Sequence, residues 1–176
     1  GNADLAMYRA KADVTRAVCF YEADMDELAR ARRNLSLDLR RAIELDQFEL
    51  HYQVQASVSG KQVVGHEVLL RWKHHERGFI PPAEFIPLAE ETGTILVIGE
   101  WVLREACSEA AGWIDGGKIA VNLSAVQLAH ADLPRLIHQV LLDTGLPASR
   151  LELEITESSI IQDKARSLHA LRQIRA

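Results

Sequence analysis

The chain has 176 residues, a formal net charge of −5 and 48% hydrophobic residues, a composition typical of soluble globular domains. The acidic balance argues against a DNA- or RNA-binding protein, because such proteins usually carry a basic face. A small anionic ligand is still compatible with this charge, since a local arginine or a bound metal ion can override it.

The cysteines and the apolar stretches favour a cytoplasmic location. Cys19 and Cys107 lie far apart and outside any Cys-x-x-Cys motif, which favours free thiols in a reducing compartment. The N-terminus shows no signal-peptide pattern, and the longest apolar stretch, residues 95–98, is too short to cross a bilayer. We expect no membrane contact from this segment, although upstream segments of a parent protein could supply an anchor.

The first part of the chain is expected to be mainly helical. Residues 2–13 place apolar side chains at helical spacing, and residues 18–21 are short, apolar and β-prone. Residues 24–46 then form a charged helix in which Leu35 and Leu39 belong to one apolar stripe. Such a stripe suits a connector that packs on a neighbouring domain or on a partner chain.

Strands alternate with helices in the rest of the chain. Apolar and polar residues alternate strictly over 48–55, and a second strand is predicted over 63–72, so a Ser-Gly turn makes this pair antiparallel. Residues 73–78 form a polar loop in which His74 and His75 are expected to be solvated. The later elements are predicted to be helices over 83–92, 95–114, 133–144 and 164–175 and strands over 119–124 and 151–156. Such repeated β-then-α units imply a largely parallel sheet, either a barrel or an open sheet.

Polar side chains gather on one face of these strands. If the apolar rows pack on the helices, the opposite face carries Gln53, Glu67, Arg71, Asn122 and Glu154. Carboxylates on an inner surface are costly unless they are paired or bound to metal. Their oxygens suit Mg²⁺ or Mn²⁺, and an arginine can fork onto a phosphate. The residues alone therefore predict a metal-dependent or carboxylate-based hydrolase.

Four blocks of the sequence, in the same order, resemble the signature of the EAL family. They are Glu-Val-Leu-Leu-Arg-Trp at 67–72, with Val68 replacing the central alanine, and the segments 79–93, 121–124 and 151–158. Upstream, Ala-Asp-Leu-Ala-Met-Tyr-Arg-Ala-Lys at 3–11 resembles the final helix of a GGDEF domain, the diguanylate-cyclase type.

The resemblance implies an α/β fold and three segments. The fold is a partial TIM-like (β/α)₈ barrel of EAL type with an antiparallel first strand pair, preceded by an N-terminal connector helix. Residues 1–23 are expected to be the C-terminal remnant of a GGDEF domain, residues 24–46 the connector helix and residues 47–176 the N-terminal half of an EAL domain.

The resemblance also implies a reaction and a set of site residues. The EAL family hydrolyses cyclic di-GMP to pGpG with two Mg²⁺ or Mn²⁺ ions. By this resemblance Glu67, Asn122 and Glu154 match the metal ligands, and Glu67 and Glu154 are thereby catalytic. The other matches are Gln53, Leu69 and Arg71 at the cyclic dinucleotide, with Arg71 on phosphate, and Glu157 as the anchor of a mobile loop.

Two departures from the family pattern affect these expectations. The family usually has Pro-Ile directly after the glutamine that matches Gln53, whereas this chain has Val54-Gln55. This change is expected to reshape the ligand's end of the pocket. Ala176 comes before the family's paired aspartates, its lysine and a later glutamate. The chain alone is therefore expected to be inactive, with activity in a longer parent. A half barrel also exposes sheet edges, which favours assembly with a second copy as a homodimer.

Two other functions fit part of the pattern. A catalytically degenerate EAL domain would act as a receptor for cyclic di-GMP or as a protein-interaction module. A glycosidase with Glu67 and Glu154 as its acid and nucleophile also fits a barrel, but that reading gives no role to Asn122.

Overall fold

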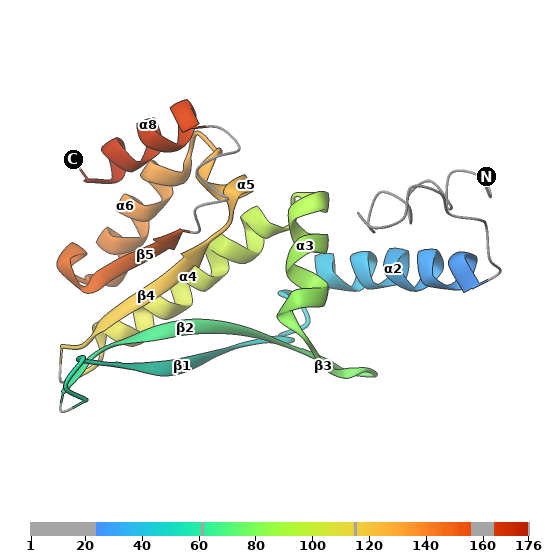
Figure 1. The fold of residues 1–176 in the computed structure, drawn as a ribbon, viewed down its shortest axis with the longest axis horizontal. Coiled ribbons are helices and arrows are strands. Elements are labelled where there is room, and N and C mark those ends of the chain that lie inside the picture. The colour runs from blue at the N-terminus through green and yellow to red at the C-terminus, as the bar shows by residue number, and fades with distance from the viewer. Residues whose placement is uncertain (1–23, 61, 115, 156–163, 176) are drawn as a thin grey trace. The chain divides into compact units, whose positions relative to one another are not determined.

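The computed structural model describes residues 24–60, 62–114, 116–155 and 164–175 (Figure 1). The helix expected over 2–13, the strand expected over 18–21 and Glu157 lie outside these residues. The chain divides into two units, residues 1–41 and 42–176. Within the first unit, the structure describes helix α2 (Asp24–Arg41).

Helix α2 ends earlier than the expected boundary at residue 46, because a turn follows it. The Gln47 N–H donates to the Ala42 carbonyl (2.9 Å), and the Asp46 N–H donates to the Ile43 carbonyl (3.1 Å). Asp46 has a left-handed φ of 52°, a conformation that Asp and Asn tolerate better than most residues. The chain then leaves this turn directly into the first strand.

The sheet in the described part of the chain is mixed. Its strands are β1 (Phe48–Ala56), β2 (Val63–His74), β3 (Gly78–Ile80), β4 (Lys118–Leu123) and β5 (Leu151–Ile155). The order is β1-β2-β4-β5, with β3 paired to β2. The β1–β2 pair is antiparallel, as predicted, and β2, β4 and β5 run parallel to one another. The short strand β3, which pairs antiparallel with the end of β2, was not predicted.

The helices follow the predicted alternation closely. They are α3 (Pro82–Thr92), α4 (Ile95–Ala111), α5 (Ala125–Leu128), α6 (Leu133–Thr144) and α8 (Lys164–Arg175), with a 3₁₀ turn η1 (Ala148–Arg150). Gly93 and Gly145 end α3 and α6 with φ of 73° and 71°, the left-handed cap that glycine adopts without strain. Elements α5 and η1 are too short to give a periodic signal and were missed. No helix in the described ranges has the length and apolar character to cross a bilayer.

The core lies between one face of the sheet and the helices α3 and α4 (Figure 1). Phe48 is its aromatic centre, with ring centroids 6.0 Å from Trp72, 6.1 Å from Phe85 and 5.9 Å from Trp101. Trp72 and Phe85 are fully buried, and the Trp72 indole N–H donates to the Gln47 side-chain oxygen (3.0 Å). Large aromatic side chains contribute much of the apolar area that a small core buries, so this cluster fixes which face of β1 and β2 points inward.

A half-buried tyrosine joins β1 to the end of α4. The Tyr52 hydroxyl donates to Glu109 Oε2 (2.7 Å), and its ring lies edge-on to Trp113 at 5.4 Å. Burial, and then the hydrogen bond to the Glu109 carboxylate, raise the pKa of the Tyr52 phenol well above its ordinary value. The phenol therefore stays a neutral donor at physiological pH.

The expectation for His74 is wrong, since this side chain is 3% exposed and belongs to β2. Its Nδ1 accepts the backbone N–H groups of Glu76 (3.2 Å) and Arg77 (3.3 Å), which places the ring proton of the neutral imidazole on Nε2. His75, as expected, is exposed, and its ring stacks on His74 at 4.7 Å. His74 therefore shapes the turn between β2 and β3.

A buried glutamine after β4 packs against a glycine of α4. Gln127 and Ser124 form a capping box, in which Gln127 Oε1 accepts the Ser124 N–H (3.0 Å) and Ser124 Oγ accepts the Gln127 N–H (3.2 Å). A Cβ at Gly99 would lie 1.9 Å from Gln127 Nε2, well inside van der Waals contact. Only glycine therefore fits at Gly99 while Gln127 caps α5.

The Gly99→Ala substitution is expected to lower the free energy of unfolding by about 1–3 kcal/mol, because the new methyl group displaces a buried amide. Urea denaturation measures this loss. Gly112→Ala is the matched control, since the nearest atom to a Cβ there is 3.4 Å away. In the Gln127→Ala background Gly99→Ala should cost less, because the two side chains no longer collide. Equal stability of Gly99→Ala and the unsubstituted protein would contradict this packing.

Burial should make Cys107 unreactive in the folded protein. Burial raises the pKa of the Cys107 thiol from 9.0 to about 11, so at pH 8 roughly 100-fold less thiolate is present than in an unfolded chain. In a Cys19→Ser variant, which leaves Cys107 as the single thiol, iodoacetamide labelling followed by mass spectrometry should be slow without urea and fast in urea. Equal rates under the two conditions would show that the thiol is accessible.

Candidate functional site

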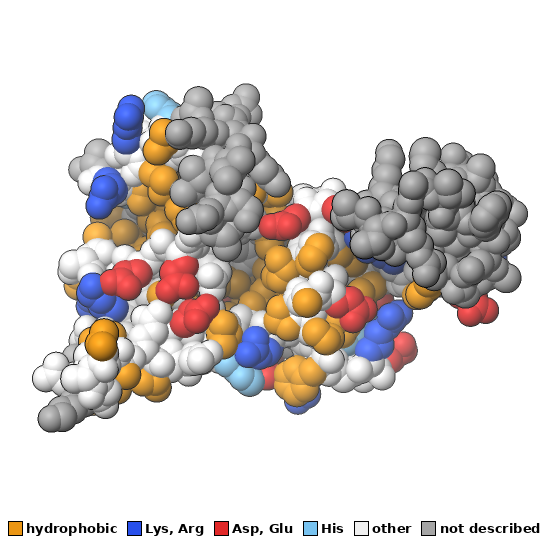
Figure 2. Space-filling model, in the orientation of Figure 1, with side chains coloured by type: hydrophobic (Ala, Val, Ile, Leu, Met, Phe, Trp, Pro, Cys, Tyr) orange, Lys and Arg blue, Asp and Glu red, His pale blue; other side chains and the backbone are white. Residues whose placement is uncertain are grey.

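The strand face opposite the helices carries the polar residues that the sequence singled out. Gln53 lies opposite Glu67 in the β1–β2 register, and Asn122 lies beside Glu154 in the β4–β5 register. Because directly paired residues point to the same side of a sheet, each pair shares one face. Figure 2 shows acidic side chains gathered over the β2, β4 and β5 region.

The most direct contact in this set joins Glu67 and Asn122. The Asn122 side-chain N–H donates to Glu67 Oε1 at 2.8 Å, between strands β2 and β4. Asn122 is exposed and Glu67 half-buried, so both side chains are accessible to a ligand from the open side. The contact places a carboxylate and an amide within reach of one small ion.

A side chain of β1, at the other end of the strand order, contacts Glu154 of β5. The Gln55 side-chain N–H donates to Glu154 Oε1 at 3.1 Å, although β1 and β5 stand at opposite ends of the strand order. Strands that are not neighbours can touch across a face only when the sheet curls, as it does in a barrel. The bond therefore lies across a concave strand face.

Glu152 lies on the same face but has a different environment. Lys118 pairs with it, and both side chains are about half exposed. An exposed pair of this kind contributes little to stability, but it neutralises Glu152. This carboxylate is therefore a natural control for Glu67 and Glu154.

A cavity of about 310 Å³ lies at the carboxyl ends of β2 and β4. Leu69, Arg71 and Asn122 line it together with residues of α3 and α4. Arg71 Nη1 donates to the Leu70 carbonyl (3.3 Å), and no carboxylate of the described residues pairs with its guanidinium. Carboxyl ends of parallel strands are where ligands bind in α/β folds, so Arg71 is placed to meet an anionic group.

The predicted residues thus come together in two groups. The structure joins Glu67 to Asn122 and places Glu154 beside Asn122 in register, while Leu69 and Arg71 line the cavity with Asn122. Gln53 is exposed opposite Glu67. Glu157 lies outside the described residues. The prediction missed the contact of Gln55, although the strict alternation of β1 already placed Gln55 on the same face as Gln53.

The donor atoms of this face fit a hard divalent cation. Within the described ranges no group of three or more His, Cys, Asp or Glu side chains could hold a metal ion. The candidate set instead has two carboxylates and one amide. Oxygen donors of this kind suit Mg²⁺ or Mn²⁺ and not a thiolate- or imidazole-rich zinc site.

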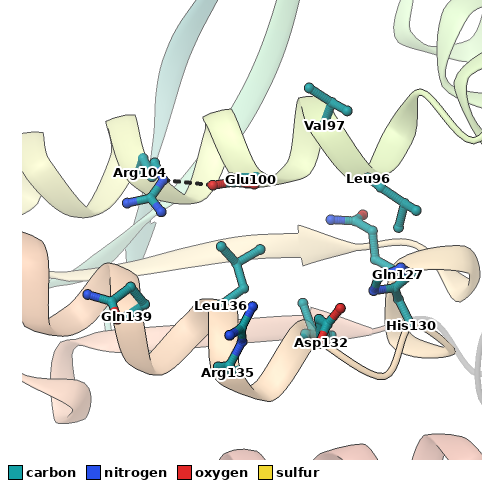
Figure 3. Close-up of a pocket in the computed structure, with 11 residues that line it drawn as sticks. Leu96, Val97, Glu100, Arg104, Gln127, His130, Asp132, Arg135, Leu136 and Gln139 are labelled. Atoms are coloured by element: carbon teal, nitrogen blue, oxygen red, sulfur yellow. Dashed lines mark hydrogen bonds and ion pairs between the residues drawn. The ribbon is translucent and has the colours of Figure 1, made fainter.

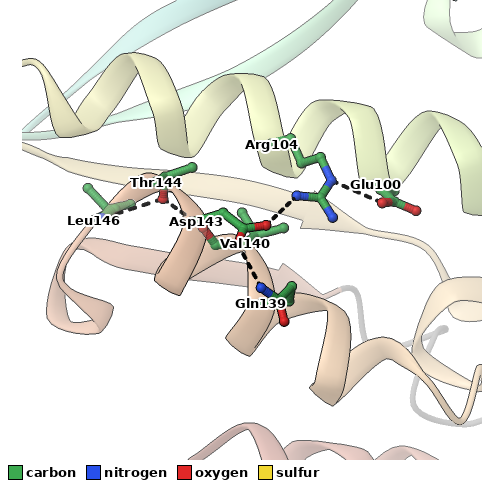
Figure 4. Close-up of polar contacts among 7 residues, drawn as sticks. All are labelled: Glu100, Arg104, Gln139, Val140, Asp143, Thr144 and Leu146. Atoms are coloured by element: carbon green, nitrogen blue, oxygen red, sulfur yellow. Dashed lines mark hydrogen bonds and ion pairs between the residues drawn. The ribbon is translucent and has the colours of Figure 1, made fainter.

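A second, larger cavity of about 450 Å³ lies between α4 and α6, away from these residues (Figure 3). Arg104 on its edge donates to Glu100 (3.0 Å) and to Asp143 (2.9 Å), and Gln139 also donates to Asp143 (2.7 Å) (Figure 4). The bonds to Asp143 and then Glu100 raise the pKa of Arg104, and those from Gln139 and then Arg104 lower the pKa of Asp143. Arg104 thus forms ion pairs with Glu100 and Asp143 at the surface. None of the predicted site residues lines this cavity.

Comparison with known proteins points to one family. The profile of the EAL domain matches residues 36–176. An uncharacterized signaling protein of Caulobacter vibrioides is 50% identical over 175 residues, which are 99% of this chain and 22% of that protein. The bifunctional diguanylate cyclase/cyclic di-GMP phosphodiesterase MucR of Pseudomonas aeruginosa is 46% identical over 179 residues, 99% of this chain and 26% of MucR.

A solved structure supports the same relationship at the level of the fold. The "PaMucR Phosphodiesterase, c-di-GMP complex" superposes with a TM-score of 0.76 and 47% identity, over 81% of this chain and 59% of that chain. The chain spans only about a quarter of the length of each of these two curated relatives.

Proposed function

Because the chain belongs to the EAL domain family, we propose that its polar strand face is part of a metal-dependent site that hydrolyses cyclic di-GMP to pGpG. The observation that carries this proposal is the Asn122–Glu67 hydrogen bond of 2.8 Å, with Glu154 next to Asn122 in register. The names of the relatives add support, since MucR is a cyclic di-GMP phosphodiesterase and its solved domain is a complex with that dinucleotide.

Each predicted residue has a role in this proposal. Glu67, Asn122 and Glu154 hold Mg²⁺ or Mn²⁺, and the bound metal supplies an acidified water and stabilises negative charge. Arg71 binds a phosphate through its guanidinium fork, while Gln53 and Leu69 hold the rest of the dinucleotide. Glu157 anchors a mobile loop near the metal.

The wider organisation is part of the same proposal. Residues 1–23 are the end of a GGDEF domain, and residues 24–46 connect it to the barrel. A longer, cytoplasmic parent carries the rest of the site and works as a homodimer, whereas the 176-residue chain alone is inactive. The length of the relatives supports a longer parent, since this chain covers 59% of the solved MucR chain.

Removal of one metal ligand should weaken Mn²⁺ binding. Glu67→Ala and Asn122→Ala are each expected to lower the Mn²⁺ affinity at least about tenfold, because changes even beyond the ligand shell cost that much. Isothermal titration calorimetry of the parent protein and its variants measures the Mn²⁺ affinity. Glu152→Ala, which removes a carboxylate from the same face that is already paired with Lys118, should leave the affinity nearly unchanged. A loss in Glu152→Ala as large as that in Glu67→Ala would point to a general charge effect and not to a site.

Turnover tests the reaction itself. The parent protein with Mg²⁺ or Mn²⁺ should convert cyclic di-GMP to pGpG, as followed by chromatography, and Glu67→Ala should abolish the product. Arg71→Lys should lower kcat/KM by about 10- to 100-fold, because the bidentate contact to phosphate is lost. Arg77→Lys, at an exposed arginine of the β2–β3 turn, is the control.

Two results would contradict the phosphodiesterase proposal. Binding of cyclic di-GMP without pGpG would favour a receptor domain, and turnover that is insensitive to chelators would exclude a metal-dependent site. The chain on its own is expected to yield no pGpG.

A further inference from the structure

The side chain of Gln55 makes a contact between the two ends of the strand order. Position 55 holds glutamine, on the same strand face as Gln53. The Gln55 side-chain N–H reaches Glu154 Oε1 at 3.1 Å across 99 positions of the chain. Gln55 is half-buried, so this bond is partly shielded from water.

The neighbouring strand leaves room for this reach. Gly65 stands directly beside Gln55 in the β1–β2 register. A Cβ at Gly65 would lie 3.2 Å from Gln55 Oε1 and 3.0 Å from the Lys118 carbonyl, so a larger residue there would crowd the amide. The register also shifts between Gln55 and Ala56, an irregularity that bends a strand and redirects its side chains.

The chemistry of an amide suits a support for a metal-binding carboxylate. Gln55 donates one hydrogen bond to one oxygen of Glu154 and adds no charge, so it does not compete with a cation as a lysine would. The second oxygen of Glu154 is left for a ligand. Carboxylates that bind metals are usually held by such outer hydrogen bonds, which fix their orientation.

We propose that Gln55 is a positioning residue that orients Glu154 toward a divalent cation in this chain. This inference rests on the proposed function, because it assumes that Glu154 binds metal. It assigns to Gln55 a role separate from that of Asn122, another amide on this face, which is itself a proposed metal ligand. Glu154 therefore depends on a donor from β1, while Glu67 contacts an amide from β4.

A metal titration of the parent protein tests the inference. Gln55→Met keeps the length of the side chain and removes the donor, and it is expected to lower Mn²⁺ affinity about tenfold, in the range found for outer hydrogen-bond partners. Gln62→Met, at an exposed glutamine of the β1–β2 turn, is the matched control and should bind Mn²⁺ normally. Gln55→Leu is a second variant with the same expected result.

A double-mutant cycle separates positioning from a general structural role. In a Glu154→Gln background, Gln55→Met should cause little further loss of Mn²⁺ affinity, because the carboxylate that it orients is gone. In Gln55→Met the Mn²⁺ concentration needed for the half-maximal rate should rise. The KM for cyclic di-GMP, measured at saturating Mn²⁺, should change less. The urea midpoint of each variant checks that the protein is folded.

Three outcomes bear against these proposals. Unchanged Mn²⁺ affinity in Gln55→Met would overturn the positioning role and leave the proposed function intact. The same loss with and without Glu154 would also overturn it, because Gln55 would then act elsewhere. A parent protein that binds no Mn²⁺ at all would remove the proposed function and this inference together.

Discussion

The hydrogen bond from Asn122 to Glu67 is the contact on which the rest of the site depends. It brings two oxygen-bearing side chains from different strands to 2.8 Å, and the β4–β5 register adds Glu154 to the pair. A carboxylate on a concave face is costly without partners. Here Asn122 and Gln55 each supply one donor, to Glu67 and Glu154 respectively, and each carboxylate keeps an oxygen for a ligand.

Packing on the opposite face of the sheet keeps these side chains in place. Phe48 and Trp72 are directly paired and lie against Phe85 of α3, and the period of a strand is two residues. A slip of one residue would therefore turn Trp72 toward the polar face and Glu67 toward the helices. The aromatic cluster thus stabilises the core and also fixes the register that gathers the site.

The sequence predicted most of the fold and part of the site. Alternation and glycine stops locate the main strands and helices from Phe48 onward, and strand parity alone places Glu67, Asn122 and Glu154 on one face. Short elements such as β3 have no period to detect, and the burial of His74 depends on tertiary packing. The Gln55–Glu154 contact was missed because it depends on how the sheet curls, which no local pattern encodes.

The most direct test of the central claim is a crystal structure of the parent protein with Mn²⁺, using anomalous scattering to locate the metal. A metal centre on this strand face should give a peak within about 2.0–2.3 Å of oxygen atoms of Glu67, Asn122 and Glu154, a distance typical of small divalent cations on oxygen ligands. Asn122 would then turn its oxygen, not its N–H, toward the metal. A peak elsewhere, or no peak while Asn122 still donates to Glu67, would contradict a metal centre on this strand face.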